Sequence, residues 1–491
     1  MPSIAGSRGC ARSSWLLLIA AALAAGGSPH APAGPVHDAA AIGDVRFLSR
    51  QLAGGVDVDE RGAGGATALL IAAREGHEAC VELLVEAGAD VAVPDQGGHT
   101  PLMAAAANGH VDCLHRLIAA GAPLEARSDT GGTALAVAAW AGRYEALDRL
   151  LLAKADPDTA DENGYTPLMM AAFRDAACVR RLLVAGADPE ARTVEGETAL
   201  MIAAWAGNIA AIEQLVRAGA DIEARDAEGE TALTRAAREG AIETIRGLLE
   251  SGASIETPNE RGETALMLAS AHADGACARF LITEGADLEA ASHNGETALM
   301  YAARHGRLAA LRHLLRAGAE VEARNDLGGT ALMAAALEGH HACADLLLEA
   351  GANVNAVNRH GYTALMAAAA GGDARTARRL LEAGAALRAR SKRGSTALLA
   401  AALNGNFECV ELLLRAGMDA DLPDHRGYTP LMAAAWRGST SCVRLLLRMQ
   451  ADVGAETRAG QTALELARRR PFEDPDREAI VNLLLSAATA E

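Results

Sequence analysis

The chain has 491 residues, with 45 Lys and Arg against 63 Asp and Glu, which gives a net charge of −18. Such a charge makes nucleic acid an unfavourable ligand, because the phosphate backbone would be repelled. Apolar residues make up 50% of the chain and aromatic residues only 3%, a composition typical of small, closely packed helices.

The first 36 residues differ from the rest. They contain no acid, carry Arg8 and Arg12, and run through the apolar stretch Trp15–Ala25 with small residues at Ala22-Leu23-Ala24. This order predicts a secretory signal peptide over residues 1–25 and a linker over 26–36, and the apolar stretch is too short to span a membrane. We therefore expect a secreted, periplasmic or lumenal protein. The alternatives are an organelle transit peptide or a low-complexity leader, and without a signal the chain would be a cytoplasmic adaptor.

From residue 67 onward, Thr-Ala-Leu or Thr-Pro-Leu recurs thirteen times. Eleven of the twelve intervals between the threonines are 33 residues and one is 32. A fixed period of this length predicts a repeat array, in which each unit buries its apolar face against its neighbours. We predict one solenoid over residues 37–491, although the length alone would suggest three domains. The units begin near residues 37, 65, 98, 131, 164, 196, 229, 262, 295, 328, 361, 394, 427 and 460.

Each unit is expected to form two short helices. The threonine suits the N-cap of the first helix, and position +1, counted from that threonine, is Pro in three units, which suits the first helical residue. Gly at position +9 in ten units predicts the end of this helix, because a left-handed residue costs least as glycine. A second helix follows, as over Cys409–Arg415, and ends before Gly417.

Three sites depart from this pattern. The +9 Gly is missing around Asp175, which accounts for the 32-residue interval, and Lys154 and Gln450 replace the glycine that ends the second helix. We interpret these as tolerated variation in loops. At the two ends, His37–Asp44 and the segment after Thr462 are expected to cap the stack against water.

The repeat resembles the ankyrin repeat in its 33-residue period, its Gly-x-Thr-Pro-Leu entry and its Ala-Gly-Ala-Asp exit, as at Ala218-Gly219-Ala220-Asp221. One difference is systematic, since position +3 is mostly Met and never the His of that family. The resemblance implies an all-α solenoid of helix-turn-helix units joined by short hairpins. It also implies a non-enzymatic scaffold that binds proteins through a concave groove and turn tips.

Seven cysteines occupy position +13, or +12 in the shortened repeat. Other units place Ala there, so the position is expected to require a small core residue. Neighbouring cysteines should lie one repeat step apart, roughly 8–10 Å, which exceeds the reach of a disulfide. We therefore predict free thiols at Cys80, Cys113, Cys178, Cys277, Cys343, Cys409 and Cys442.

Seven of the aromatic residues gather at two positions. Position +7 holds Trp140, Phe173, Trp205 and Trp436, and position −1 holds Tyr165, Tyr362 and Tyr428. Large aromatic side chains on an open helix face are typical anchors of a protein interface. We predict that Trp140, Phe173 and Trp205 with Tyr165 form the main partner-binding site, and that Tyr362, Tyr428 and Trp436 contribute elsewhere. The alternative is that these side chains only pack between repeats.

Four consecutive units carry Glu at position −1: Glu197, Glu230, Glu263 and Glu296. On exposed turns they would form an acidic ridge that favours a partner with a basic surface. The alternative is a row of glutamates that only keeps the turns solvated.

Sequence motifs for catalysis are absent, including phosphate loops, nucleophile elbows and zinc-binding patterns. The nearest constellation is His272 and His305, with Glu239 and Glu338 in the same row, which would have to share a metal across an open face. We therefore expect a monomeric, non-enzymatic binding protein without a cofactor. A metal-dependent enzyme that uses His272 and His305 is the remote alternative.

Overall fold

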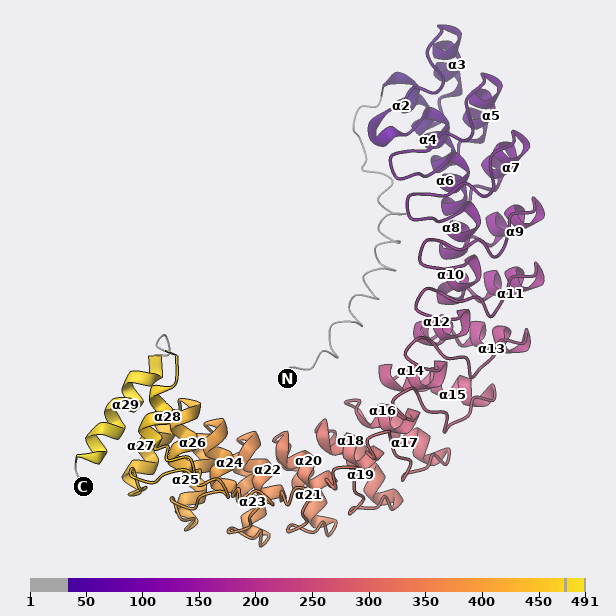
Figure 1. Cartoon of the computed structure of the whole chain (residues 1–491). Helices are drawn as coiled ribbons and strands as arrows, with labels where there is room; N and C mark the ends of the chain where they lie inside the picture. The colour runs from indigo at the N-terminus through magenta and orange to yellow at the C-terminus, as the bar shows by residue number, and fades with distance from the viewer. Residues whose placement is uncertain (1–33, 472–474, 490–491) are drawn as a thin grey trace. The chain divides into compact units, whose positions relative to one another are not determined.

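The computed structural model describes residues 34–471 and 475–489, and in these ranges every regular element is a helix (Figure 1). The predicted signal peptide, residues 1–25, lies outside the described residues. The all-helical fold class is confirmed. No helix among the described residues has the length and apolar character needed to cross a membrane.

Each repeat contributes a pair of helices, as predicted. The first helices are α2 (Pro35–Ile42), α4 (Ala68–Glu75), α6 (Pro101–Asn108), α8 (Ala134–Trp140), α10 (Pro167–Arg174), α12 (Ala199–Ala206), α14 (Ala232–Glu239), α16 (Ala265–Ser270), α18 (Ala298–Arg304), α20 (Ala331–Leu337), α22 (Ala364–Gly371), α24 (Ala397–Asn404), α26 (Pro430–Arg437) and α28 (Ala463–Arg468). The second helices are α3 (Val45–Ala53), α5 (Glu78–Glu86), α7 (Val111–Ala119), α9 (Tyr144–Leu152), α11 (Ala176–Val184), α13 (Ile209–Arg217), α15 (Ile242–Glu250), α17 (Ala276–Thr283), α19 (Leu308–Ala317), α21 (His341–Glu349), α23 (Ala374–Glu382), α25 (Phe407–Arg415), α27 (Thr440–Arg448) and α29 (Pro475–Ala488). A single 3₁₀ turn, η2 (Ala63–Gly65), precedes α4.

The helices fall into two compact units. The N-terminal unit comprises the chain up to residue 232 together with 246–253, and the C-terminal unit comprises 233–245 together with 254 onward. Within each unit, first helices pack against the first helices of the adjoining repeats and against their own second helices, as α24 does with α22, α26 and α25. The second helices form a parallel row behind them, for example α23, α25 and α27.

The threonines begin the first helices as predicted. The Thr67 hydroxyl accepts a hydrogen bond from the backbone N–H of Leu70 at 3.2 Å, and nine further repeats have the same cap at position +3, at Thr100, Thr133, Thr166, Thr198, Thr330, Thr363, Thr396, Thr429 and Thr462. The hydroxyls of Thr264 and Thr297 lack this partner. The N-cap therefore fixes where most repeats turn from hairpin to helix.

The core lies between successive first helices and in front of the second helices. In α24, all residues from 397 to 402 are buried, because neighbours cover the helix on both sides and from behind. Position +13 is a core position as predicted, since both Cys409 and Ala310 are 0% exposed. All seven cysteines of the described chain are free and buried. Small residues at these positions let the helices approach closely, which explains the abundance of alanine.

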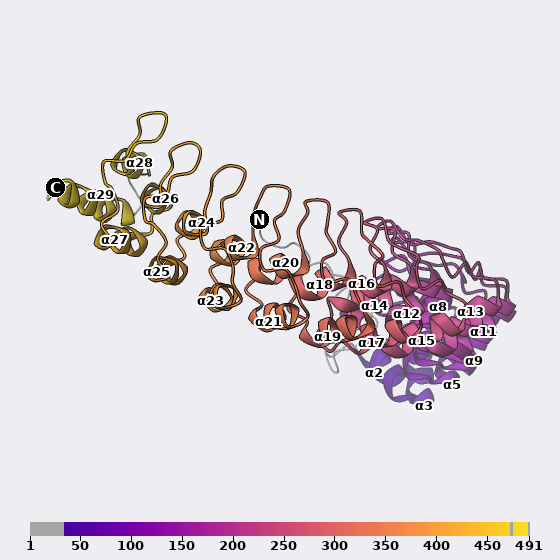
Figure 2. The ribbon, with the colours of Figure 1, turned by 90° about the horizontal axis from the view of Figure 1, so that it is seen from below.

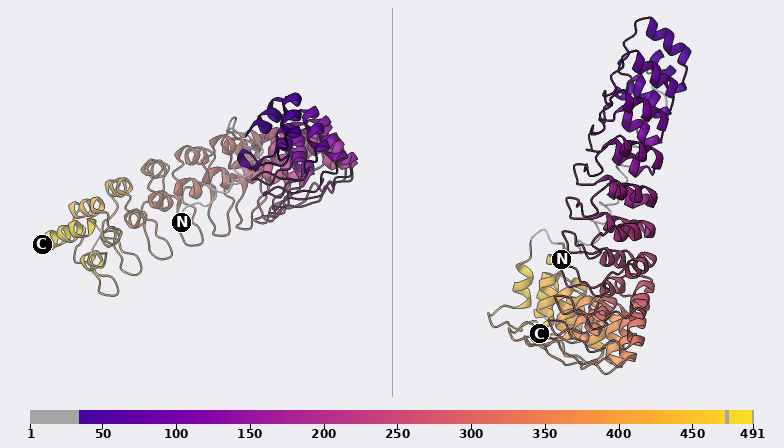
Figure 3. Two further views of the ribbon diagram at one scale, coloured as in Figure 1. Left: turned by 90° about the horizontal axis from the view of Figure 1, so that it is seen from above. Right: turned by 90° about the vertical axis from the view of Figure 1, so that its right-hand side faces the viewer.

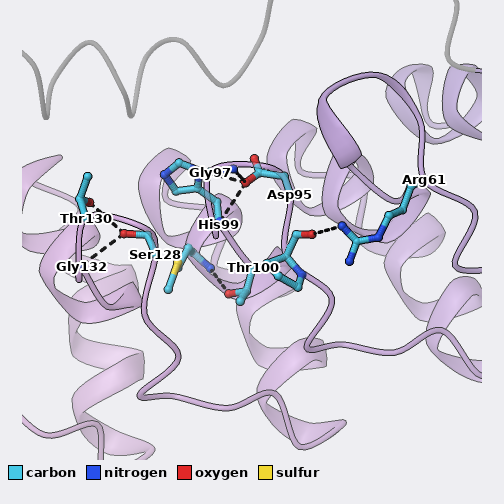
Figure 4. Close-up of polar contacts among 10 residues, drawn as sticks. Arg61, Asp95, Gly97, His99, Thr100, Ser128, Thr130 and Gly132 are labelled. Carbon is cyan, nitrogen blue, oxygen red and sulfur yellow. Dashed lines mark hydrogen bonds and ion pairs between the residues drawn. The ribbon is translucent and has the colours of Figure 1, made fainter.

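Long hairpin loops connect the repeats, and a side chain at position −5 closes turns such as the one before Thr100. Asp95 accepts hydrogen bonds from the backbone N–H groups of Gly97 and His99, both at 2.9 Å (Figure 4). Successive hairpins are joined by a backbone bond, such as that from Asp129 N to the carbonyl of Gly97 at 3.0 Å. In the C-terminal unit the hairpins stand in a row on one side of the helices (Figures 2 and 3).

The irregular sites keep the repeat geometry by other means. In the shortened repeat, Asp175 ends α10 and also caps α11, where its carboxylate accepts the Ala177 N–H at 2.8 Å. Lys154 and Gln450 adopt the left-handed conformation of the glycines that they replace, with φ of 74° and 61°. They are the only non-glycine residues with positive φ in the described chain.

Candidate partner-binding surfaces

The aromatic residues at position +7 of the N-terminal unit form a stack across three repeats. The rings of Trp140 and Phe173 are stacked with centroids 5.3 Å apart, and those of Phe173 and Trp205 with centroids 5.4 Å apart. The three residues lie at or next to the last turns of α8, α10 and α12, which hold them one repeat step apart. We call Trp140, Phe173 and Trp205 the aromatic ladder.

Burial differs along the aromatic ladder. Trp140 is only 6% exposed, whereas Phe173 and Trp205 are half-buried. The guanidinium of Arg174 lies 5.9 Å from the ring centroid of Trp140 and covers it further. Trp140 is thus mainly a packing residue, while the other two rings offer rigid apolar surface to solvent. The packing interpretation therefore applies to Trp140, whereas partner binding by Phe173 and Trp205 stays a prediction.

Tyr165 is tied into the hairpins beside the ladder. Its hydroxyl donates a hydrogen bond to the carboxylate of Glu197 in the next repeat, at 3.3 Å. Burial, followed by the charge of Glu197, raises the pKa of the Tyr165 phenol above its usual range. The hydroxyl is therefore engaged inside the chain, and only the half-buried ring remains for contact.

The glutamates at position −1 do not form the exposed ridge that we expected. Glu197 and Glu230 of the N-terminal unit are 6% and 4% exposed, Glu263 of the C-terminal unit is 8% exposed, and Glu296 is half-buried. The reason is local geometry, because position −1 lies at the base of the hairpin, where side chains from positions +4 and +7 cover it. The expectation of exposure was wrong, and a partner-binding role for these four residues stays a prediction.

The covering side chains are visible in the C-terminal unit. Tyr301, at position +4, donates a hydrogen bond to Glu263 at 2.6 Å, and Arg238, at position +7, lies 3.7 Å from the same carboxylate. Arg304, also at position +7, forms an ion pair with Glu296 of its own repeat. Sequence reasoning missed these partners. Their signal was a polar residue at both +4 and +7 in two of the four units that carry Glu at −1, namely Arg235 with Arg238 and Tyr301 with Arg304.

Position +7 is also apolar and exposed near the end of the C-terminal unit. Trp436 is 49% exposed, Leu337 46% and Leu403 40%, with the half-buried Ala370 between the two leucines. Tyr428 and Tyr362 lie half-buried at position −1 of the same repeats. Burial and the neighbouring charge of Asp424 raise the pKa of Tyr428 to about 12. The sequence prediction included Trp436 but missed the two leucines that share its position.

His272 and His305, the two histidines of the remote metal hypothesis, each lie beside a different residue of the chain. The Nδ1 atom of His272 lies 3.7 Å from a carboxylate oxygen of Asp274, and the ring of His305 lies against Tyr301 with centroids 6.3 Å apart. Burial, together with Arg307 and Arg304, lowers the pKa of His305. The residues that the structure describes include no cluster of three or more His, Cys, Asp or Glu able to hold a metal ion.

The thiols are equally unsuited to nucleophilic chemistry. Burial raises the pKa of every cysteine at position +13, for example to about 11 for Cys343 and to about 12 for Cys409. A thiol of this kind holds its proton at neutral pH and behaves as a small apolar residue.

Comparison with known proteins agrees with the architecture. A family model described as ankyrin repeats (3 copies) matches in eight overlapping placements that together run from residue 36 to residue 490. Among solved structures, the ankyrin repeat domain of Bcl-3, titled a unique member of the IkappaB protein family, is 30% identical. That match covers 44% of this chain and 98% of that one, with a TM-score of 0.40. A search of curated proteins finds no match.

Proposed function

Because the chain belongs to the ankyrin-repeat family, whose repeats are generally protein-interaction modules, we propose that it is a non-enzymatic scaffold that binds a protein partner through the aromatic ladder. The observation that carries this proposal is the stack of three rings across α8, α10 and α12, two of which keep exposed area. Preordered aromatic rings bury large apolar area on binding and lose little conformational freedom.

The hairpins of the same repeats give the partner a charge preference. Their tips carry Asp129, Glu162 and Glu195, all exposed. Together with the net charge of −18, they favour a partner whose surface is basic around an apolar patch. The preference for a basic partner therefore rests on these exposed tip residues, and no longer on the glutamates at position −1, most of which are buried.

The test compares what the full-length tagged protein retains from extracts of its own source. Phe173→Ala with Trp205→Ala removes the exposed rings, while Trp436→Ala removes a comparable ring from the C-terminal unit and serves as the control. We expect a protein that the wild type and the control retain and that the double variant loses, with circular dichroism unchanged. If all three retain the same proteins, the ladder is not the binding site.

We also propose that residues 1–25 direct export, on the strength of their basic, apolar and small-residue order. Mass spectrometry of the mature protein should then find an N-terminus close to Ala25. An intact Met1 region would contradict export and support the cytoplasmic adaptor instead.

A further inference from the structure

The hairpin tips of the C-terminal unit carry a row of basic side chains. Positions −4 and −3 of four consecutive hairpins hold Arg359 and His360, Lys392 and Arg393, His425 and Arg426, and finally Arg458. All seven are exposed, and none takes part in an ion pair within residues 34–471 and 475–489. We call these residues the basic tip row.

The side chains that close these turns carry little negative charge. The side chain that closes each turn at position −5 is neutral in three of the four hairpins, as Asn358, Ser391 and Thr457, and is acidic only as Asp424. The basic tip row therefore stands out from a chain whose overall charge is −18, and it attracts anionic groups locally.

The backbone holds the tips in a fixed order. Lys392 N donates to the carbonyl of His360, His425 N to that of Arg393, and Arg458 N to that of Arg426, each at 2.9 Å. Neighbouring tips are thus joined directly, one repeat step of roughly 8–10 Å apart. Figure 2 shows the hairpins that precede α22, α24, α26 and α28 side by side.

An exposed apolar stripe runs along two of these repeats, through Leu403 and Trp436, and begins at Leu337 in the repeat that precedes the basic tip row. It consists of Leu337, Leu403 and Trp436, which are 46%, 40% and 49% exposed. A side chain at position +7 reaches the base of its own hairpin, as the ion pair between Arg304 and Glu296 shows in this unit. The apolar stripe and the basic tip row therefore border one face of the C-terminal unit.

We propose that this face binds an acidic polypeptide segment in an extended, polyproline-like conformation. Such a segment rises about 3.1 Å per residue and repeats every three residues, so its period of about 9.3 Å matches one repeat step. Carboxylates at every third residue would then meet successive tips, while apolar residues on an adjoining side of the segment would cover the stripe.

A polypeptide explains the face better than a nucleic acid does. The exposed apolar side chains in the repeats of the basic tip row, Leu403 and Trp436, have no counterpart on a phosphate backbone. The net charge of −18 would repel a long polyanion outside this row. This surface lies in a different unit from the aromatic ladder, so it adds a second site and its failure would leave the proposed function untouched.

The test uses the full chain and a fluorescein-labelled peptide of four Glu-Leu-Pro triplets, with binding followed by anisotropy at low salt. The control peptide has the same composition with its four Glu contiguous. The tip variant and a control variant each lose four positive charges from exposed residues of the C-terminal unit. They are Arg359→Gln, Lys392→Gln, Arg393→Gln and Arg426→Gln at the tips, and Arg375→Gln, Arg378→Gln, Arg444→Gln and Arg448→Gln on α23 and α27.

We expect the triplet peptide to bind the wild type and the helix-surface control alike, and the tip variant about tenfold or more weakly, since four exposed ion pairs are lost and each contributes only modestly. Leu403→Ala should weaken binding as well. Equal loss in both charge variants, or equal binding of the contiguous-Glu peptide, would overturn the proposal. It would also be overturned if a short oligothymidylate bound more tightly than the peptide, or if sedimentation showed that a second copy of the chain occupies the row.

Discussion

Lys154 sits in a backbone conformation that suits glycine, and its replacement by glycine should stabilise the N-terminal unit. Its φ is 74°, and its N–H still donates to the carbonyl of Leu151 at 3.0 Å. At the equivalent glycines, such as Gly121 and Gly186, an added Cβ would meet nothing within 4 Å. The Lys154 side chain is therefore not crowded, and any loss of stability at this position comes from its left-handed backbone conformation.

The magnitude follows from two opposing effects. A non-glycine residue in the left-handed region costs roughly 1–2 kcal/mol, and glycine returns about 0.5–1 kcal/mol of this because it gains more freedom on unfolding. Lys154→Gly should therefore raise the free energy of unfolding by about 0.5–1 kcal/mol. Local opening that unwinds α9 should become about two- to fivefold rarer.

A long repeat array cannot be assumed to unfold in two states. The change is therefore measured by amide hydrogen exchange of the full chain, followed on the peptides that cover α9. The matched control is Ala153→Gly, because Ala153 has φ of −76° and gains nothing from glycine. We expect slower exchange in the first variant and faster exchange in the second. Unchanged or faster exchange in Lys154→Gly would refute the argument from backbone strain.

Three further changes test other parts of the framework. Tyr165→Phe removes the hydrogen bond to Glu197 and keeps the ring, so it should lower the free energy of local opening around α10 by about 0.5–1.5 kcal/mol in the same hydrogen-exchange assay. Unchanged exchange would mean that the bond contributes nothing. Cys343→Ala should lower stability by about 1 kcal/mol or less, and Cys343→Leu should lower it more, because the buried position has no room for a larger side chain. A higher melting temperature for the leucine variant than for the alanine variant would contradict this. Burial lowers the pKa of His305 in the folded chain, so its contribution to stability is complete above its unfolded pKa, near 6.5, and is lost as the pH falls through the folded value. His305→Gln should remove that part of the acid dependence of the urea midpoint, and an identical profile would exclude His305 as its source.

The sequence predicted the helices better than the surfaces. The period, the threonine caps and the small residue at position +13 are local or strictly repeated signals, and the structure reproduces each of them. Even the missing glycines at Lys154 and Gln450 were visible, although their left-handed backbone could not be read from residue type. What single residues do between repeats was harder to predict, because it depends on which neighbour covers them.

The glutamates at position −1 show why. Their row suggested exposed turns, yet Glu263 is buried because Tyr301 donates to it and Arg238 lies close by. A contact of this kind joins residues 38 positions apart, and only the known geometry of the stack would have paired position −1 with positions +4 and +7.

Position +7 links these observations. Arg238 and Arg304 at this position reach the glutamates at the base of a hairpin, whereas apolar residues at the same position behave differently. Where it is arginine, as in Arg304, it is consumed by a carboxylate of its own chain. Where it is large and apolar, no such partner exists within the repeat, and the side chain either stacks on its neighbours, as Phe173 does, or stays exposed, as Leu403 does. The three repeats between the two apolar sets carry Arg238, Ala271 and Arg304 at this position. Both arginines lie against carboxylates of the chain and the alanine is small, so these repeats have least apolar surface to offer a partner. Under the two proposals made above, recognition therefore concentrates on the repeats around Trp205 and around Trp436, where the charge of the neighbouring hairpin tips favours the partner.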